Sequence, residues 1–248
     1  MTKNLLVPFD QSSPHCILLN GQTVEFHLKR NRGLRAIGLK VDFAGLTVTA
    51  PLRASVRSIS DVLHTHADWV LKKVEAWRRN APPKVEWRHG ASLPFLGRPL
   101  PLNVVVQPRR SGTCWSDLTG LNLVFATQPD HDVIKTKVFD WYRFEARRYF
   151  PQRIAHLAAV ANIATPRFFL SNAHSRWGSC SVDGDIRMTW RLMKAAPHVI
   201  DYVAAHELAH LAHMDHSPRF WRRLAEIFPD YEAARDELRH NDALYRIF

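Results

Sequence analysis

Alternation of apolar and polar positions dominates the start of the chain. Two pairs of strand-like runs occur, at residues 16–19 and 23–29 and at residues 36–41 and 46–50, and the second run of each pair alternates. A period of two is typical of half-buried strands, and glycines between paired runs, here Gly21 and Gly45, favour tight turns. We therefore expect two β-hairpins, with Pro51 ending the second.

The spacing of apolar residues changes to three and four after Pro51 and predicts one long helix from residue 55 to residue 79. Its buried stripe would consist of Ile59, Val62, Leu63, Ala67, Val70, Leu71 and Val74. Short apolar runs then predict three strands, at residues 93–96, 100–107 and 121–125. The N-terminal part of the chain is therefore expected to be rich in β-structure and to carry one long helix.

Helical spacing returns after these strands. A helix is expected from Val133 to about Phe150, with Asp132 as its N-cap. Pro151 lies inside the periodic pattern, so it would either kink this helix or open another that runs to Ala161.

The pattern in the last third of the chain predicts a small sheet followed by helices. Strands are expected at residues 168–171, 176–181 and 186–192, and Asp183-Gly184 favours a hairpin between the last two. Helices are expected at residues 197–214, 218–228 and 230–239. Ser217 followed by Pro218 is typical of a helix start.

These elements predict an α+β fold in two parts. The first part, residues 15–130, is β-rich and contains the helix at 55–79. The second part, residues 131–248, contains the small sheet and the last helices. A chain of 248 residues is long enough to bury a sizeable hydrophobic core in this arrangement.

One motif with metal-ligand spacing lies in the helix expected at 197–214. His206 and His210 are four residues apart, so both imidazoles can reach one Zn²⁺ at roughly 2.0–2.1 Å. Glu207 completes an HExxH arrangement, in which zinc acidifies a bound water and the glutamate takes its proton. Surface histidines that bind no metal are the alternative. The helical context favours the metal site.

A third protein ligand would leave one open position on the zinc. His213 lies on the same face as His206, but about 10.5 Å farther along the helix. His216 follows Met214, and a turn before Ser217 can bring it back to the metal. His216 is therefore the candidate, although spacing alone does not exclude His213.

The cysteines and the hydrophobic segments of the sequence predict where in the cell the protein is located. Cys16, Cys114 and Cys180 form no paired framework, which favours a reducing, cytoplasmic location. Residues 1–13 show no secretory signal pattern, and no apolar run reaches 18 residues, so no membrane span is expected. Cys180 is expected to be structural rather than a fourth metal ligand.

The net charge of the chain is strongly positive, at +11, and residues 1–131 carry 17 Lys and Arg against 9 Asp and Glu. A basic N-terminal half favours anionic partners such as nucleotides, nucleic acid or acidic peptides. No compact basic run of the nucleic-acid type occurs, so a solvated surface is the simpler interpretation. A nucleic-acid-associated binding protein with a silent zinc site remains one alternative.

Several segments of the sequence resemble the YgjP-like metallopeptidase family. They are residues 176–181 (RWGSCS), 186–192 (IRMTWRL), 199–203 leading into 206–210, and 216–221 (HSPRFW). The resemblance is strongest over residues 168–228 and covers about 21–245 as one unit. The family is similar to the SprT-like and WLM zinc proteases and has a minimal zincin core.

The resemblance implies Zn²⁺ held by His206, His210 and His216, with Glu207 as the catalytic residue. It implies a zinc-dependent hydrolase, most simply a metallopeptidase. The family also includes a member described as a nucleotide pyrophosphatase acting on UTP. Hydrolysis of a nucleoside triphosphate at the same site is therefore the alternative.

Four residues are candidates for substrate binding, namely Arg176, Trp177, Arg187 and Arg191. In a peptidase, the strand expected at 176–181 would pair with an extended peptide. In nucleotide hydrolysis, the arginines would hold phosphate oxygens. Arg187 and Arg191 would share one face of the strand expected at 186–192, about 13 Å apart at roughly 3.3 Å per residue.

Overall fold

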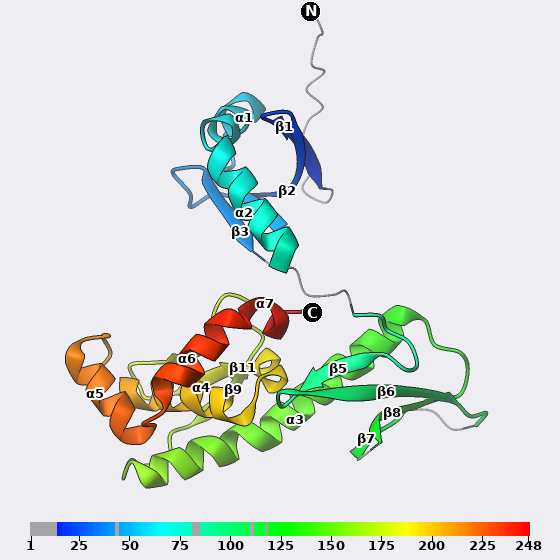
Figure 1. The fold of residues 1–248 in the computed structure, drawn as a ribbon, viewed down its shortest axis with the longest axis vertical. Helices are drawn as coiled ribbons and strands as arrows, with labels where there is room; N and C mark the ends of the chain where they lie inside the picture. Colours follow the sequence, from blue (N-terminus) through cyan, green and yellow to red (C-terminus); the bar gives the residue numbers. More distant parts are fainter. Residues whose placement is uncertain (1–13, 43–44, 81–84, 110–111, 118) are drawn as a thin grey trace, which may run out of the picture. The chain divides into compact units, whose positions relative to one another are not determined.

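The computed structural model describes residues 14–42, 45–80, 85–109, 112–117 and 119–248 (Figure 1). The expectation that residues 1–13 carry no signal sequence concerns positions outside this range. The chain separates into two units, Met1–Pro82 and Pro83–Phe248. This boundary differs from the division expected after residue 130, because strands at 92–125 share a hydrophobic core with the helices that follow them. Helices and strands occur in both units, which confirms the α+β class.

The first unit contains a four-stranded sheet in the order β1-β2-β4-β3. Its strands are β1 (His15–Leu19), β2 (Gln22–Asn31), β3 (Gly38–Asp42) and β4 (Gly45–Pro51). Both expected hairpins are confirmed, since β1 pairs antiparallel with β2 and β3 pairs antiparallel with β4. The alternating apolar positions form a core with two helices, α1 (Val56–Thr65) and α2 (Ala67–Asn80).

The single helix expected from residue 55 to residue 79 is wrong. Helix α1 ends at Thr65, and His66 breaks the helical geometry with φ −106° and ψ 21° before α2 begins. Threonine and histidine have low helix propensity, and the Thr65 hydroxyl donates to the carbonyl of Asp61. The apolar spacing continues through the break, so periodicity could not reveal it.

The second unit is built along α3 (His131–Val160), a helix of 30 residues. Asp130 caps this helix, because its side chain accepts from the Val133 N–H at 2.8 Å, so the predicted cap at Asp132 is wrong. The helix runs through Pro151 without ending. Proline has no N–H, so the carbonyl of Arg147, four residues earlier, lacks its usual donor in the helix. Arg147 is exposed, and water can donate to this carbonyl instead.

A four-stranded sheet in the order β5-β6-β8-β7 packs against α3 (Figure 1). Its strands are β5 (Ser92–Phe95), β6 (Arg98–Val106), β7 (Thr113–Asp117) and β8 (Gly120–Phe125). Strand β7 was not predicted, because its described side chains are all exposed and show no apolar alternation. The other three lie within a few residues of their expected positions.

A three-stranded sheet in the order β10-β11-β9 precedes the motif helix. Its strands are β9 (Phe168–Ser171), β10 (Gly178–Cys180) and β11 (Ile186–Thr189). The strand expected to reach residue 192 ends at Thr189, where the 3₁₀ helix η1 (Trp190–Lys194) begins. The β5–β6 hairpin holds this turn, since the amides of Leu96 and Gly97 donate to carbonyls of η1.

The four last helices are α4 (Pro197–His210), α5 (Pro218–Ile227), α6 (Tyr231–His240) and α7 (Asp242–Tyr245). Helix α4 ends at His210 rather than at Met214 as expected. The predicted start of α5 is confirmed, with Ser217 at the N-cap and Pro218 in the first turn. Most of α4 is buried, and it packs against α3, α5, α6 and β10.

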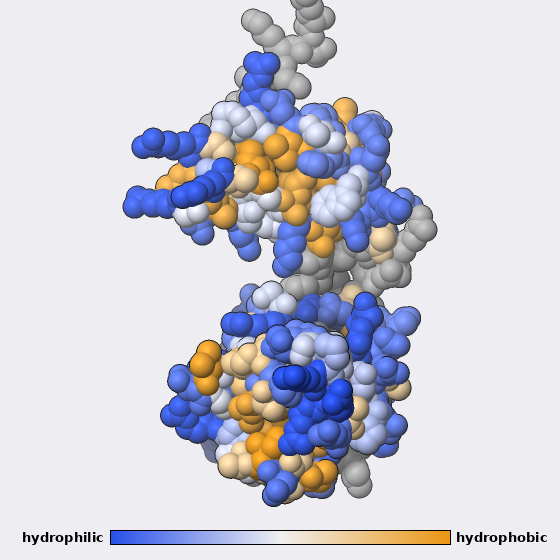
Figure 2. Space-filling view, turned by 90° about the vertical axis from the view of Figure 1, so that its left-hand side faces the viewer, coloured by the Kyte–Doolittle hydropathy of each residue, from blue (hydrophilic) through white to orange (hydrophobic). Residues whose placement is uncertain are grey.

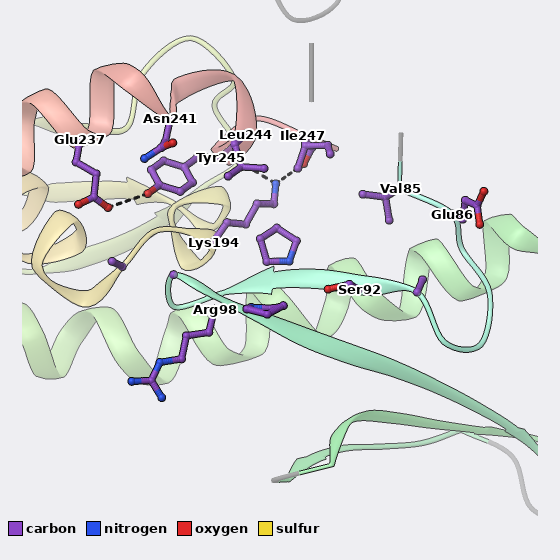
Figure 3. A pocket seen from close by; sticks show the side chains of 15 residues that line it. Val85, Glu86, Ser92, Arg98, Lys194, Glu237, Asn241, Leu244, Tyr245 and Ile247 are labelled. Carbon is purple, nitrogen blue, oxygen red and sulfur yellow. Dashed lines mark hydrogen bonds between the residues drawn. The ribbon is translucent and has the colours of Figure 1, made fainter. Parts of the chain in front are cut away.

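Buried Lys194 fixes the end of the chain to η1. Its ammonium group donates to the carbonyls of Tyr245 at 3.2 Å, Phe248 at 3.1 Å and Ile247 (Figure 3). Burial lowers the pKa of Lys194 well below its usual value. The side chain forms part of the wall of a cavity of about 620 Å³ between the β5–β6 hairpin and α7.

Hydrophilic side chains form most of the face shown in Figure 2, with apolar side chains in small patches on each unit. Exposed apolar residues of the first unit include Leu18, Leu52 and Trp69. Among the described residues, no helix has both the length and the apolar character needed to cross a membrane.

A bidentate ion pair joins α3 to α4. Arg153 Nε lies 2.7 Å from Asp201 Oδ1, and Arg153 Nη2 lies 2.7 Å from Asp201 Oδ2. Asp201 is only 7% exposed, whereas the Arg153 side chain is 32% exposed. A carboxylate buried in this way depends on its partner, because the charge has little access to water.

Arg153→Leu should lower the free energy of unfolding by about 2–3 kcal/mol, since it leaves the Asp201 carboxylate buried and unpaired. Urea denaturation of the full-length chain measures this. Arg148→Leu is the matched control on the same helix, because Arg148 is 62% exposed and lies 3.3 Å from Glu145, and it should change stability by less than about 0.5 kcal/mol. Equal losses in the two variants would show that the ion pair has no special role.

Candidate metal centre

Three imidazole nitrogens converge at the end of α4. The Nε2 atoms of His210 and His216 each lie 3.2 Å from the Nε2 atom of His206. All three ligand atoms lie within 4.8 Å of one another. His206 and His210 come from one face of α4, and His216 comes from the loop before α5.

A tight turn after α4 brings His216 back to the helix. The amides of Leu211, Ala212 and His213 donate to carbonyls of the last helical turn. The His213 carbonyl then accepts from Nδ1 of His210 at 3.0 Å. His213 therefore contributes its backbone to this arrangement, and its side chain is not part of the cluster.

Two of the separations between the imidazole nitrogens match those of a tetrahedral metal ion. With zinc–nitrogen bonds of about 2.05 Å, two tetrahedral ligands lie about 3.3 Å apart, close to the 3.2 Å that separates His206 Nε2 from each of the other two Nε2 atoms. Nδ1 of His210 donates to a carbonyl, which leaves its Nε2 lone pair free to face a metal. The donor set therefore fits zinc.

Burial keeps the imidazoles of His206 and His210 neutral. Burial, together with the nearby His210 and His216, lowers the pKa of His206 to about 3. Burial likewise lowers the pKa of His210. Because a lowered pKa means that the proton is lost below neutral pH, both side chains present lone pairs at neutral pH.

Aromatic side chains of α5 support the three imidazoles. The ring of Phe220 is fully buried, and its centroid lies 4.9, 4.6 and 4.8 Å from those of His206, His210 and His216. The indole N–H of Trp221 donates to the His216 carbonyl at 3.1 Å. Side chains that follow the motif in sequence therefore hold the three histidines in place.

Glu207 lies on a different face of α4 from the histidine pair and packs under β10. It is 5% exposed, and its Oε2 atom is buried and has no hydrogen-bond partner in the described structure. Burial raises the pKa of Glu207 to about 8, and the charge of Arg176 opposes this shift. A buried carboxyl group beside three converging imidazoles is a candidate for a general base.

Two of the substrate-binding candidates lie at the approach to β10. Arg176 is exposed, and its charge acts on Glu207. Trp177 is anchored in the fold, because its indole N–H donates to Asp242 at 3.0 Å and Arg246 lies over its ring at 4.1 Å. Of this pair, Arg176 is the one free to meet a substrate.

The expected arrangement of Arg187 and Arg191 on one strand face is wrong, because Arg191 lies in η1. Arg191 is 3% exposed and donates to the backbone and side chain of Asn172 and contacts His174. It holds the loop that leads to β10. Arg187 is partly exposed on β11, 5.1 Å from the ring centroid of Phe169.

Cys180 follows Gly178 on the same face of β10 and is half-buried. It does not belong to the group of side chains that could hold a metal in the described chain. Burial raises the pKa of its thiol, with Glu207 adding to the shift, so the thiolate needed for metal binding is disfavoured.

Sequence reasoning missed three residues of this site, Gly178, Phe220 and Trp221. Gly178 lies against Glu207, and the two aromatic residues support the histidines. One signal was available for the two aromatic residues, because Phe220 and Trp221 lie at the start of α5 shortly after His216. Gly178 could not be identified in the same way, because its contact with Glu207 joins two segments that are far apart in the sequence.

Comparisons with solved structures give two metallopeptidase zymogens of low similarity. Abylysin from Pyrococcus abyssi matches with 21% identity and a TM-score of 0.34, covering 36% of this chain and 90% of that one. Jannalysin from Methanocaldococcus jannaschii matches with 18% identity and a TM-score of 0.33, covering 38% of this chain and 96% of that one. A comparison with curated proteins finds no match.

A family model gives the broader assignment. The model described as "YgjP-like, metallopeptidase domain" matches residues 35–241, which include most of the first unit and nearly all of the second. This match confirms the resemblance found in the sequence. The chain therefore belongs to the YgjP-like metallopeptidase domain family.

Proposed function

We propose that this protein is a zinc-dependent peptidase in which His206, His210 and His216 hold the metal and Glu207 is the general base. Membership of the family supports a metallopeptidase that uses a divalent metal. The convergence of three imidazole Nε2 atoms, two of them 3.2 Å from the third, is the observation that carries the proposal.

The roles of the residues follow from their environments. Zinc, when bound, would polarise the scissile carbonyl and lower the pKa of a bound water. Glu207 would take the proton of that water and pass it to the leaving amine. Its buried position supports this role, because burial makes the carboxylate a stronger base than that of a solvent-exposed glutamate.

The open edge of β10 supports an extended peptide as the substrate. Trp177 and Ser181 pair with β11, since the Thr189 amide donates to the Trp177 carbonyl and the Ser181 amide donates to the Asp185 carbonyl. Alternation then directs the N–H and C=O groups of Gly178 and Cys180 away from β11. No other strand of the described structure pairs with that edge, so a peptide could add to it.

The nucleotide alternative has weaker support. Phosphate recognition needs cations that converge beside the metal. Arg191 is buried against Asn172, and Arg187 lies over Phe169, so these two arginines do not form the predicted pair. Arg176 alone is exposed and electrostatically coupled to Glu207.

His216→Ala should lower zinc affinity by about 100-fold or more, because it removes one of three ligands. His213→Ala is the matched control, since the contribution of His213 is a backbone carbonyl that alanine retains. Competition with a chromophoric chelator measures both affinities. If the two variants lose affinity equally, His216 is not a ligand.

Glu207→Gln should retain zinc and reduce kcat for peptide hydrolysis by about 10²–10⁴-fold, because an amide cannot accept the proton of water. A quenched-fluorescence peptide library, with zinc content measured in parallel, tests this. Glu226→Gln is the control, since Glu226 is an exposed partner of Arg223 and should leave kcat unchanged. Wild-type turnover in Glu207→Gln would remove Glu207 from the mechanism.

A further inference from the structure

Gly178 makes an unusually close approach to Glu207. A Cβ atom placed on Gly178 would lie 2.3 Å from Glu207 Oε1 and 2.8 Å from both Cδ and Cγ of the same side chain. Non-bonded carbon and oxygen atoms normally stay more than about 3 Å apart, with carbon pairs optimal at about 3.5–4.0 Å. Any side chain at position 178 would therefore displace either the carboxyl group or the strand.

Position 178 favours glycine because there is little room for a Cβ atom, and not because of its backbone conformation. Seven glycines of the described chain have positive φ angles that disfavour other residues, and Gly178 is not among them. Its pairing with Met188 is that of a regular antiparallel strand, which any residue can adopt. The three nearest atoms to the added Cβ all belong to Glu207, so the restriction comes from that one side chain.

Neither side of the contact can retreat easily. Glu207 is 5% exposed on a helix that is packed on several faces. Strand β10 is held on one side by β11, whose residue Met188 is fully buried. Just before the strand, Trp177 is tied to Asp242 through its indole N–H. A methyl group at position 178 would therefore cost packing energy, because relaxation is limited.

We infer that Gly178 is a positioning residue for Glu207. Because Gly178 has no side chain, the Glu207 carboxyl group can lie directly against the open edge of β10. This inference rests on the proposed role of Glu207 as the base. The backbone groups of Gly178 point toward the space where a peptide would pair, while its Cα faces the carboxyl group. One residue thus fixes the base relative to the substrate strand.

Thermal unfolding of the full-length chain, freed of metal by a chelator, tests the contact itself. Gly178→Ala should lower the Tm by about 4–8 °C in the otherwise wild-type chain. In a Glu207→Ala background the same change should lower the Tm by less than about 2 °C, because the carboxyl group is gone. Gly33→Ala is the matched control, since the same methyl group meets only Asn31 Oδ1 at 3.7 Å.

Turnover of the zinc-loaded chain tests the positioning role. Gly178→Ala should reduce kcat for peptide hydrolysis by about 10–100-fold, because displacements near 1 Å have effects of this size. Zinc affinity should stay within about threefold of wild type, since the three atoms nearest to a Cβ at position 178 all belong to Glu207 and none to a histidine. A variant that binds zinc normally but turns over slowly has a displaced Glu207, whereas a variant that has lost its structure would also lose zinc affinity.

Different results would contradict the positioning role of Gly178 and the proposed peptidase function. Equal Tm losses from Gly178→Ala in the two backgrounds, or wild-type kcat in this variant, would overturn the inference on Gly178. An absence of hydrolysis by the wild-type zinc-loaded chain would overturn the proposed function, whatever the Tm values show. Coupled Tm losses together with a lowered kcat support the positioning role.

Discussion

The arrangement depends on the convergence of three imidazole nitrogens. Two of them belong to His206 and His210 on α4, and the third belongs to His216, beyond the end of that helix. A helix can bring side chains four residues apart to one ion, but its rise carries later residues away. The chain therefore has to stop the helix at His210 and reverse. The hydrogen bond from His210 Nδ1 to the His213 carbonyl closes that turn and leaves the Nε2 lone pair of His210 facing the other two imidazoles.

The surrounding fold holds α4 still. The Arg153–Asp201 pair ties α4 to the long helix α3, and the ring of Phe220 packs against all three imidazoles. Strand β10 lies so close to α4 that a Cβ atom at position 178 would overlap the carboxyl group of Glu207. The three histidines and Glu207 are thus held by contacts from several elements, which limits their motion relative to one another.

Local patterns predicted those parts of the structure that local forces determine. Alternation gave the hairpins of the first unit, and Ser217 with Pro218 gave the start of α5. Tertiary contacts decided the rest. The strand from Ile186 ends at Thr189 because the β5–β6 hairpin binds the following turn, and no local signal records this. The predicted set of His206, His210 and His216 came from motif spacing and family resemblance, whereas the contact between Gly178 and Glu207 joins residues distant in sequence and could not be predicted.

The proposed function requires one zinc ion held by three imidazoles and no thiolate. X-ray absorption spectroscopy at the zinc edge, on the zinc-loaded full-length protein, measures this coordination. We predict one zinc per chain with nitrogen and oxygen donors at about 2.0–2.1 Å, and imidazole scattering that fits three rings. A sulfur shell at about 2.3 Å, or scattering from fewer than three imidazoles, would contradict the proposed coordination.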